Sequence, residues 1–223
     1  MRRLVLVRHG ESIYNAEARV QGQQCAGLSE LGHAQAKATA AAVALAYPDA
    51  RLFVSDLQRT RETIAPLAEA FAQEPVQDER LRERSFGVWE GHLRSEVVRD
   101  EPDRWQRWLQ GEDVIGEIGG ETSEELVARV LPVFTQLLAD TPDGSTTIVV
   151  THGGPVWHGV HRMLELDRPI FAGVNNCSIT ELSAGSSAVP MLRRWNEVGH
   201  LPVDLREGWL APVAATDGPP VGR

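Results

Sequence analysis

The stretch "LVLVRHGES" (residues 4–12) joins an apolar run to an arginine, a histidine and a glycine. Such a short aliphatic run is typical of a central strand that is covered on both faces of a sheet. A second stretch, "TTIVVTHGG" (residues 146–154), has the same order and also ends in His-Gly. Ligands bind outside the carboxyl ends of the strands in open α/β sheets. We therefore predict that His9 and His152 face one crevice if the two strands are neighbours.

Further strands and helices are expected to alternate along the chain. Ser29 is placed as an N-cap, and Thr122 with Glu125 has the spacing of a capping box. The alternation predicts a three-layer α/β/α fold with a mostly parallel central sheet. The additional expected strands are residues 51–55, 178–182 and 190–195, and the expected helices are residues 29–47, 55–73 and 122–140.

Residues 84–120 differ from the rest because they are rich in tryptophan, glycine and charge. This composition predicts a small, mainly helical cap insertion over the sheet, in which Trp105 and Trp108 either pack the cap or line a substrate wall. No linker divides the chain, so we expect one domain over residues 1–210. Residues 211–223 contain proline, glycine and alanine without periodicity, and are predicted to form a flexible tail.

The composition limits the class of protein. The chain has 223 residues, 42% of them hydrophobic, and a formal net charge of −9. An acidic chain argues against nucleic acid or an anionic membrane as the main partner. No apolar run has the length of a membrane span or of a signal-peptide core, so we expect a cytoplasmic protein. Cys25 and Cys177 fit no metal-site spacing and are interpreted as free thiols. A homodimer is left open.

Arginines accompany the two histidines. Arg8 precedes His9, and "SDLQRTRET" (residues 55–63) offers Arg59 and Arg61 at the start of an expected helix. A helix N-terminus favours an anion through its dipole and its free N–H groups. A guanidinium is a planar fork that suits phosphate oxygens. These residues predict a pocket for a tetrahedral dianion, and hence a small phosphorylated metabolite as the partner.

The same residues suggest a reaction. A neutral imidazole is nucleophilic enough to attack phosphorus and form a phospho-enzyme. The leaving oxygen then needs a proton donor, for which Glu83 in "LRERSFG" (residues 81–87) is the candidate, with Glu79 and Glu90 as alternatives. His158 and His161 have no third ligand at a matching spacing and are interpreted as ordinary helix residues. No metal and no cofactor are expected.

Taken in order, the blocks "LVRHGES", "RVQGQ", "LSELGHAQA", "SDLQRTRET", "LRERSFGVWEG", "GGET" and "VVTHGG" resemble the histidine phosphatase superfamily, which includes the cofactor-dependent phosphoglycerate mutases. The resemblance implies that His9 is the phosphorylated nucleophile and Glu83 the general acid. Cys25 and Ala26 depart from the pattern, because many relatives carry an aspartate there. The other positions for which the resemblance implies a role in binding phosphate or substrate are Arg8, Asn15, Gln21, Gly22, Gln23, Arg59, His152 and Gly153.

The family resemblance leaves three functions to compare. The short cap before "GGET" favours a phosphatase over a phosphoglycerate mutase, whose members carry a longer insertion after the acid. A non-catalytic phosphate-binding regulator is disfavoured, because both His9 and Glu83 are present. Sugar phosphates, glucosyl-3-phosphoglycerate, α-ribazole 5′-phosphate and other small phosphomonoesters all remain open as substrates.

Overall fold

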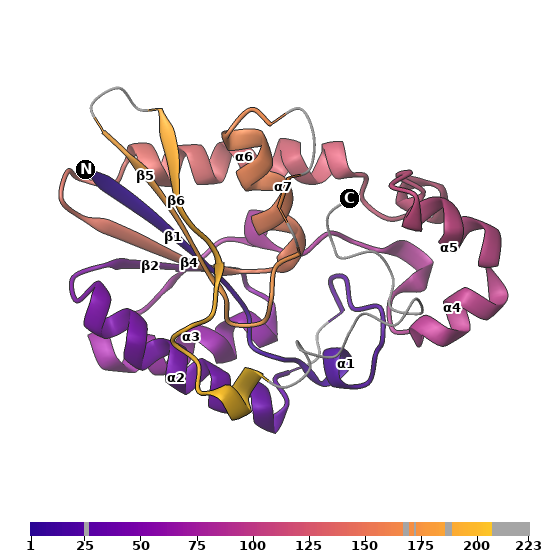
Figure 1. Cartoon of the computed structure of the whole chain (residues 1–223), viewed down its shortest axis with the longest axis horizontal. Helices are drawn as coiled ribbons and strands as arrows, with labels where there is room; N and C mark the ends of the chain where they lie inside the picture. Colours follow the sequence, from indigo (N-terminus) through magenta and orange to yellow (C-terminus); the bar gives the residue numbers. More distant parts are fainter. Residues whose placement is uncertain (25–26, 167–169, 172, 186–188, 207–223) are drawn as a thin grey trace.

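A computed structural model of the chain describes residues 1–24, 27–166, 170–171, 173–185 and 189–206 (Figure 1). Within these residues a six-stranded sheet has the order β3-β2-β4-β1-β5-β6. The four strands from β3 to β1 are parallel to one another, whereas β5 is antiparallel to both β1 and β6. The predicted mostly parallel sheet is confirmed. The strands are β1 (Arg2–Arg8), β2 (Arg51–Val54), β3 (Val76–Gln77), β4 (Thr146–Thr151), β5 (Ile179–Ala184) and β6 (Pro190–Glu197).

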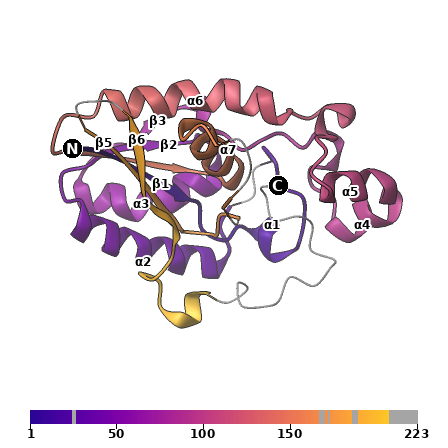
Figure 2. The same ribbon diagram turned by 45° about the horizontal axis from the view of Figure 1, so that its top comes forward.

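Two pairs of helices cover the two faces of the sheet, as Figures 1 and 2 show. Leu4 and Leu6 of β1 belong to a core with α6 and α7, whereas Val5 and Val7 belong to a core with α2 and α3. Alternate side chains of a strand point to opposite faces, so the uninterrupted apolar run follows from burial on both sides. The predicted three-layer fold is confirmed. The covering helices are α2 (Glu30–Ala46), α3 (Gln58–Phe71), α6 (Ser123–Ala139) and α7 (Gly153–Met163).

The predicted helix starts are also present. The side chain of Ser29 accepts a hydrogen bond from the Gly32 amide at 3.0 Å, and Thr122 and Glu125 form a capping box. Two short elements were not predicted from the sequence. One is the helix α1 (Ile13–Ala16), and the other is β3, whose two residues are exposed and carry no apolar pattern.

The cap contains η2 (Gly87–Trp89), α4 (Arg94–Asp100), α5 (Pro102–Leu109) and η3 (Ile115–Ile118), and it has its own small core. Figures 1 and 2 place α4 and α5 to one side of the sheet, beyond the end at which β1 and β4 finish, rather than over a face of the sheet. The predicted tail at residues 211–223 lies outside the described residues, as do Cys25 and Ala26.

The described helices include none that is long and apolar enough to cross a membrane. His158 and His161 lie on α7, and the structure groups no three potential metal ligands within the residues it describes. The Cys177 thiol is buried, and burial raises its pKa to about 12.

Lowering the pH from 6.5 to 4.5 is expected to reduce the free energy of unfolding, in part through His158. Burial, followed by the charge of Arg84, lowers the pKa of His158 to about 4, whereas an unfolded histidine has a pKa near 6.5. The unfolded chain therefore binds more protons in this window, and stability is lost as the pH falls. The loss for this group amounts to at most about 1.4 kcal/mol per pH unit.

Urea unfolding at a series of pH values measures this loss. The pKa values of His9 and His152 are also lowered, so the wild type should lose more than His158 alone accounts for. The variant His158→Gln removes one titrating group and should therefore lose less stability per pH unit. An unchanged pH dependence in this variant would contradict the assignment.

Candidate active site

His9 lies at the carboxyl end of β1, where the hydrogen-bond ladder to β4 continues through its amide to the carbonyl of Thr151 at 2.9 Å. The imidazole is buried, and its Nδ1 lies 2.7 Å from the carbonyl oxygen of Gly10. A carbonyl oxygen only accepts hydrogen bonds, so Nδ1 carries the proton of the neutral ring. Nε2 is therefore left with a free electron pair, as a nucleophile requires.

The surroundings of His9 keep its ring neutral. Burial, followed by the positive charges of Arg59 and Arg8, lowers the pKa of His9 well below its usual value. The two arginines beside His9 thus disfavour the protonated form of its ring. The nucleophilic form of His9 consequently predominates at neutral pH.

His152 lies at the end of β4, directly before α7, and its ring meets that of His9 edge to face with the centroids 5.2 Å apart. The two strands are neighbours, as the prediction required, and the rings of the two histidines meet at their ends. His152 Nε2 lies 2.9 Å from the hydroxyl of Ser55. Its Nδ1 is buried and has no hydrogen-bond partner among the described residues, and the same holds for Nε of Arg8.

Arg59 is the second residue of α3 and is fully buried. Its guanidinium donates to the carbonyl oxygens of Gly22 at 2.8 Å and Gln24 at 3.1 Å, which ties the loop after α1 to the site. Arg61 is exposed and lines a separate hollow beside Ile64. The structure thus brings Arg59 to the histidines and leaves Arg61 elsewhere.

Glu83 lines one pocket together with His9 and Arg8. Its carboxylate accepts hydrogen bonds from the amides of Arg84 at 2.8 Å and Gly154 at 3.2 Å. A Cβ at position 154 would lie 2.3 Å from the carboxylate, so the glycine permits this close approach. The carboxyl group is therefore held at the N-terminus of α7, beside the second histidine.

The two alternative candidates for the proton donor, Glu79 and Glu90, have other surroundings than Glu83. The side chain of Glu79 is 75% exposed and contacts Arg82. Glu90 accepts hydrogen bonds from the amides of Phe86 at 2.8 Å and Gln23 at 3.2 Å, so it holds two loops together. Of the three candidates, Glu83 is the one that lines the pocket of His9.

The comparisons with known proteins agree with this geometry. Residues 4–198 match the family described as "Histidine phosphatase superfamily (branch 1)". The chain belongs to the histidine phosphatase superfamily. A glucosyl-3-phosphoglycerate phosphatase of Mycobacterium tuberculosis is 33% identical over 82% of this chain and 85% of its own. A probable phosphoglycerate mutase of Shigella dysenteriae is 36% identical over 82% of this chain and 85% of its own.

A solved structure supports the same relationship. The mycobacterial glucosyl-3-phosphoglycerate phosphatase in complex with VO3 superimposes with a TM-score of 0.78 at 33% identity, covering 89% of this chain and 100% of the other. The predicted family and fold are therefore confirmed, whereas the roles assigned to single residues stay predictions.

The remaining predicted residues of this histidine phosphatase lie around the same centre. Asn15, Gln21 and Gly22 line the pocket. The side-chain amide of Gln23 instead donates to the carbonyl oxygen of Glu83 at 3.1 Å. Gly153 begins α7, and a Cβ built on it would lie 3.6 Å from Nε of Arg8, so its backbone lies beside that guanidinium.

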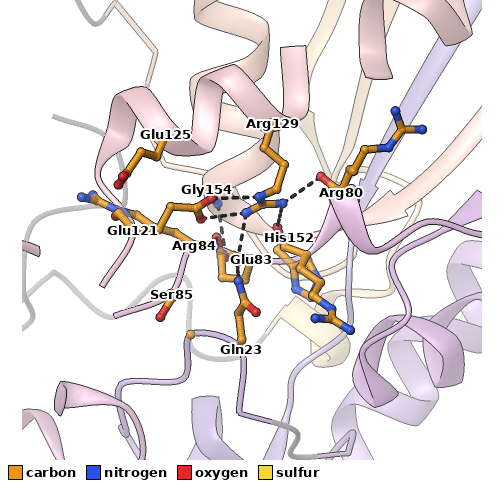
Figure 3. Close-up of polar contacts among 12 residues, drawn as sticks. Gln23, Arg80, Glu83, Arg84, Ser85, Glu121, Glu125, Arg129, His152 and Gly154 are labelled. Atoms are coloured by element: carbon orange, nitrogen blue, oxygen red, sulfur yellow. Dashed lines mark hydrogen bonds and ion pairs between the residues drawn. The ribbon is translucent and has the colours of Figure 1, made fainter. Parts of the chain in front are cut away.

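Arg129 of α6 was not predicted from the sequence, and Figure 3 shows it at the centre of a polar cluster. Its guanidinium donates to the carbonyl oxygens of Arg80 at 2.8 Å and Arg82 at 3.0 Å, and more weakly to that of Glu83 at 3.4 Å. Two further hydrogen bonds, of 2.7 and 2.8 Å, join it to the Glu121 carboxylate. This side chain holds the segment that carries Glu83 against α6.

Proposed function

We propose that this histidine phosphatase hydrolyses a small phosphomonoester of the sugar-phosphate or phosphoglycerate type through a phosphohistidine on His9. The observation that carries the proposal is the contact of His9 Nδ1 with the carbonyl oxygen of Gly10 at 2.7 Å, which leaves the electron pair of Nε2 free beside a pocket that His9 and Glu83 both line. The similarity to glucosyl-3-phosphoglycerate phosphatases supports the class of substrate.

In the first step, Nε2 of His9 attacks phosphorus and forms the N–P bond while the bond from phosphorus to the leaving oxygen breaks. Glu83, protonated at this stage, donates its proton to the leaving alcohol. Arg8, Arg59 and His152 surround the transferring group and stabilise the charge on its equatorial oxygens.

In the second step, water attacks the phosphohistidine. The Glu83 carboxylate accepts a proton from this water, the N–P bond breaks, and phosphate and neutral His9 are released. Glu83 is then protonated again, as the next turnover requires. The cycle needs no electron transfer.

Phosphoglycerate mutase activity is the second candidate function, because the chain is 36% identical to a probable phosphoglycerate mutase. A mutase would return the phosphoryl group from His9 to an organic acceptor instead of to water. Incubation of the enzyme with 3-phosphoglycerate and 2,3-bisphosphoglycerate distinguishes a mutase from a phosphatase. Formation of 2-phosphoglycerate faster than release of inorganic phosphate would favour the mutase.

Phosphate release is expected to proceed without a metal ion, because guanidinium groups supply the positive charge that a metallophosphatase takes from its cations. The measurement is phosphate release from a panel of phosphorylated metabolites, with and without EDTA. We expect equal rates, and competitive inhibition by vanadate, which mimics phosphate. A rate that falls with EDTA and returns with Mg²⁺ or Zn²⁺ would overturn this expectation, and a panel without any turnover would overturn the proposed function.

A further inference from the structure

Ser55 is a buried serine in direct contact with His152. It follows β2, and its amide continues the ladder to β4 by donating to the carbonyl oxygen of Val150 at 3.1 Å. The residue is fully buried, and its Oγ lies 2.9 Å from Nε2 of His152. The hydroxyl of Thr60 in α3 donates to the carbonyl oxygen of Ser55 at 2.8 Å. A strand and a helix thus hold the Ser55 hydroxyl against the imidazole.

The surroundings of the Ser55 hydroxyl offer its proton a single acceptor. A hydroxyl has one proton to donate and two electron pairs that accept. The amide of Leu57 reaches Oγ at 3.5 Å, and an amide N–H only donates, so this long contact uses an electron pair of Oγ. Within the described residues the one acceptor for the hydroxyl proton is Nε2 of His152.

The two neutral tautomers of His152 differ in how many buried polar groups they leave without a partner. Burial, followed by the positive charge of Arg59, lowers the pKa of His152 well below its usual value, so the ring carries one proton at neutral pH. With that proton on Nδ1, Ser55 donates to Nε2, and the Nδ1–H group alone lacks a partner within the described residues. With the proton on Nε2, the hydroxyl proton of Ser55 and the electron pair of Nδ1 would both lack one there. Each such group costs free energy, so the Nδ1–H tautomer is favoured.

The Nδ1 atom of His152 faces the side of the sheet on which His9 lies. β4 runs between β2 and β1, so Ser55 and His9 follow the strands on either side of it. The two nitrogens of an imidazole point away from each other, and Nε2 is occupied by Ser55. The other edge of the ring therefore turns toward β1, where the rings of His152 and His9 meet with their centroids 5.2 Å apart. An Nδ1–H group there can donate to a phosphoryl group at His9, whereas a bare electron pair would repel its oxygens.

We propose that Ser55 is a positioning residue that fixes His152 in the Nδ1–H tautomer, so that this N–H group donates to the oxygens of the transferring phosphoryl group. The inference rests on the proposed phosphatase function and adds the residue that prepares His152 for its part in it. His9 is prepared in a matching way, since its Nδ1 proton is held by the carbonyl oxygen of Gly10. A backbone carbonyl thus leaves His9 with an electron pair at Nε2, and a serine hydroxyl leaves His152 with a proton at Nδ1.

The tautomer of His152 can be measured without turnover. In protein labelled with ¹⁵N at its histidines, long-range ¹H–¹⁵N correlation spectra at neutral pH distinguish a protonated ring nitrogen from an unprotonated one, and the His152→Gln variant identifies the signals of His152. Wild-type protein should carry the proton of His152 on Nδ1. Ser55→Ala removes the hydroxyl that selects this form and should populate both tautomers. A wild-type His152 with its proton on Nε2 would overturn the inference and leave the phosphatase function standing.

Kinetics measure what the fixed tautomer contributes to the reaction. Ser55→Ala should lower kcat/KM by roughly 2- to 13-fold, the factor that corresponds to the net free energy of one neutral hydrogen bond. The loss stays modest because the phosphoryl group itself still favours the Nδ1–H form. It should be equal for p-nitrophenyl phosphate and glycerol 3-phosphate, since His152 acts on the phosphoryl group and not on the leaving group.

Two further variants complete the experiment. Ser55→Thr keeps the hydroxyl and should keep most of the wild-type kcat/KM. Ser183→Ala is the matched control, because it removes the hydroxyl of a buried serine on β5 that instead accepts a hydrogen bond from Arg193 at 2.7 Å, and it should leave kcat/KM unchanged. Circular dichroism checks that each variant is folded.

The kinetic outcomes also separate this inference from the proposed function. An unchanged kcat/KM in folded Ser55→Ala would overturn the role of Ser55, and so would an equal loss in folded Ser55→Thr, since the hydroxyl would then not be the group that matters. A loss confined to glycerol 3-phosphate would overturn it as well, because it would show a disturbed proton donor. Each of these results leaves the phosphatase function standing, whereas absence of turnover with every phosphomonoester would overturn both.

Discussion

Replacing His9 with alanine is expected to lower kcat by roughly 10⁴- to 10⁶-fold, the range found when an enzyme loses its nucleophile. Without the imidazole, water must attack phosphorus directly, and what remains is the charge stabilisation by Arg8, Arg59 and His152 and the proton donation by Glu83. The fold should persist, because the side chain lies beyond the apolar run of β1. Circular dichroism checks the fold, and phosphate release measures the loss.

The covalent intermediate gives the second readout. Rapid quenching of wild-type enzyme with a ³²P-labelled substrate should trap label that is stable to base and labile to acid, as expected for a phosphohistidine. His9→Ala should trap none. His33→Ala is the control, because it removes a histidine whose side chain is 54% exposed on α2, and it should keep both label and activity. Label on a serine or an aspartate would contradict the proposed mechanism.

The sequence predicts the central layers of the fold because burial on both faces leaves a local pattern. Leu4 to Val7 form an apolar run for this reason, and Ser29 and Thr122 mark helix starts through their own side chains. The strand β3 leaves no such pattern, because its two exposed residues are held by pairing with β2. The predicted position of the cap over the sheet differs from the observed one beyond the strand ends, because its tryptophans pack into a small core of the cap itself and carry no signal of where the cap lies.

The candidate site likewise contains residues that the sequence predicts and a residue that it does not. His9 and His152 follow recognisable strands, so their meeting could be predicted from the rule for strand ends. Arg129 could not be predicted, because an arginine on a helix has the same local pattern whether it faces solvent or the segment that carries Glu83. Only the packing of α6 on that segment gives this residue its place.

Replacing Glu83 with glutamine is expected to lower kcat by about 10²- to 10⁴-fold on an alkyl phosphate such as glycerol 3-phosphate, the usual contribution of a general acid. An alkoxide is a very basic leaving group and needs the proton. A p-nitrophenolate is far less basic, so turnover of p-nitrophenyl phosphate should fall much less. Glutamine keeps the size of the side chain, and its oxygen can still accept the hydrogen bond from the amide of Gly154, whereas its amide nitrogen cannot accept the one from Arg84.

The ratio of the two losses distinguishes proton donation from positioning. Glu83 is held by two backbone amides, and its carbonyl oxygen is held by Gln23, so a disturbed loop would misplace the phosphate and slow both substrates alike. Glu79→Gln is the suitable control, because that carboxylate is exposed and lies outside the pocket, and it should slow neither substrate. Glu90→Gln would be a poorer control, since Oε1 of Glu90 accepts the amides of both Gln23 and Phe86, and the neutral oxygen of glutamine is a weaker acceptor for these two loops. If Glu83→Gln slows both substrates by the same factor, the carboxylate positions the phosphate, and the proton must come from another group in the pocket.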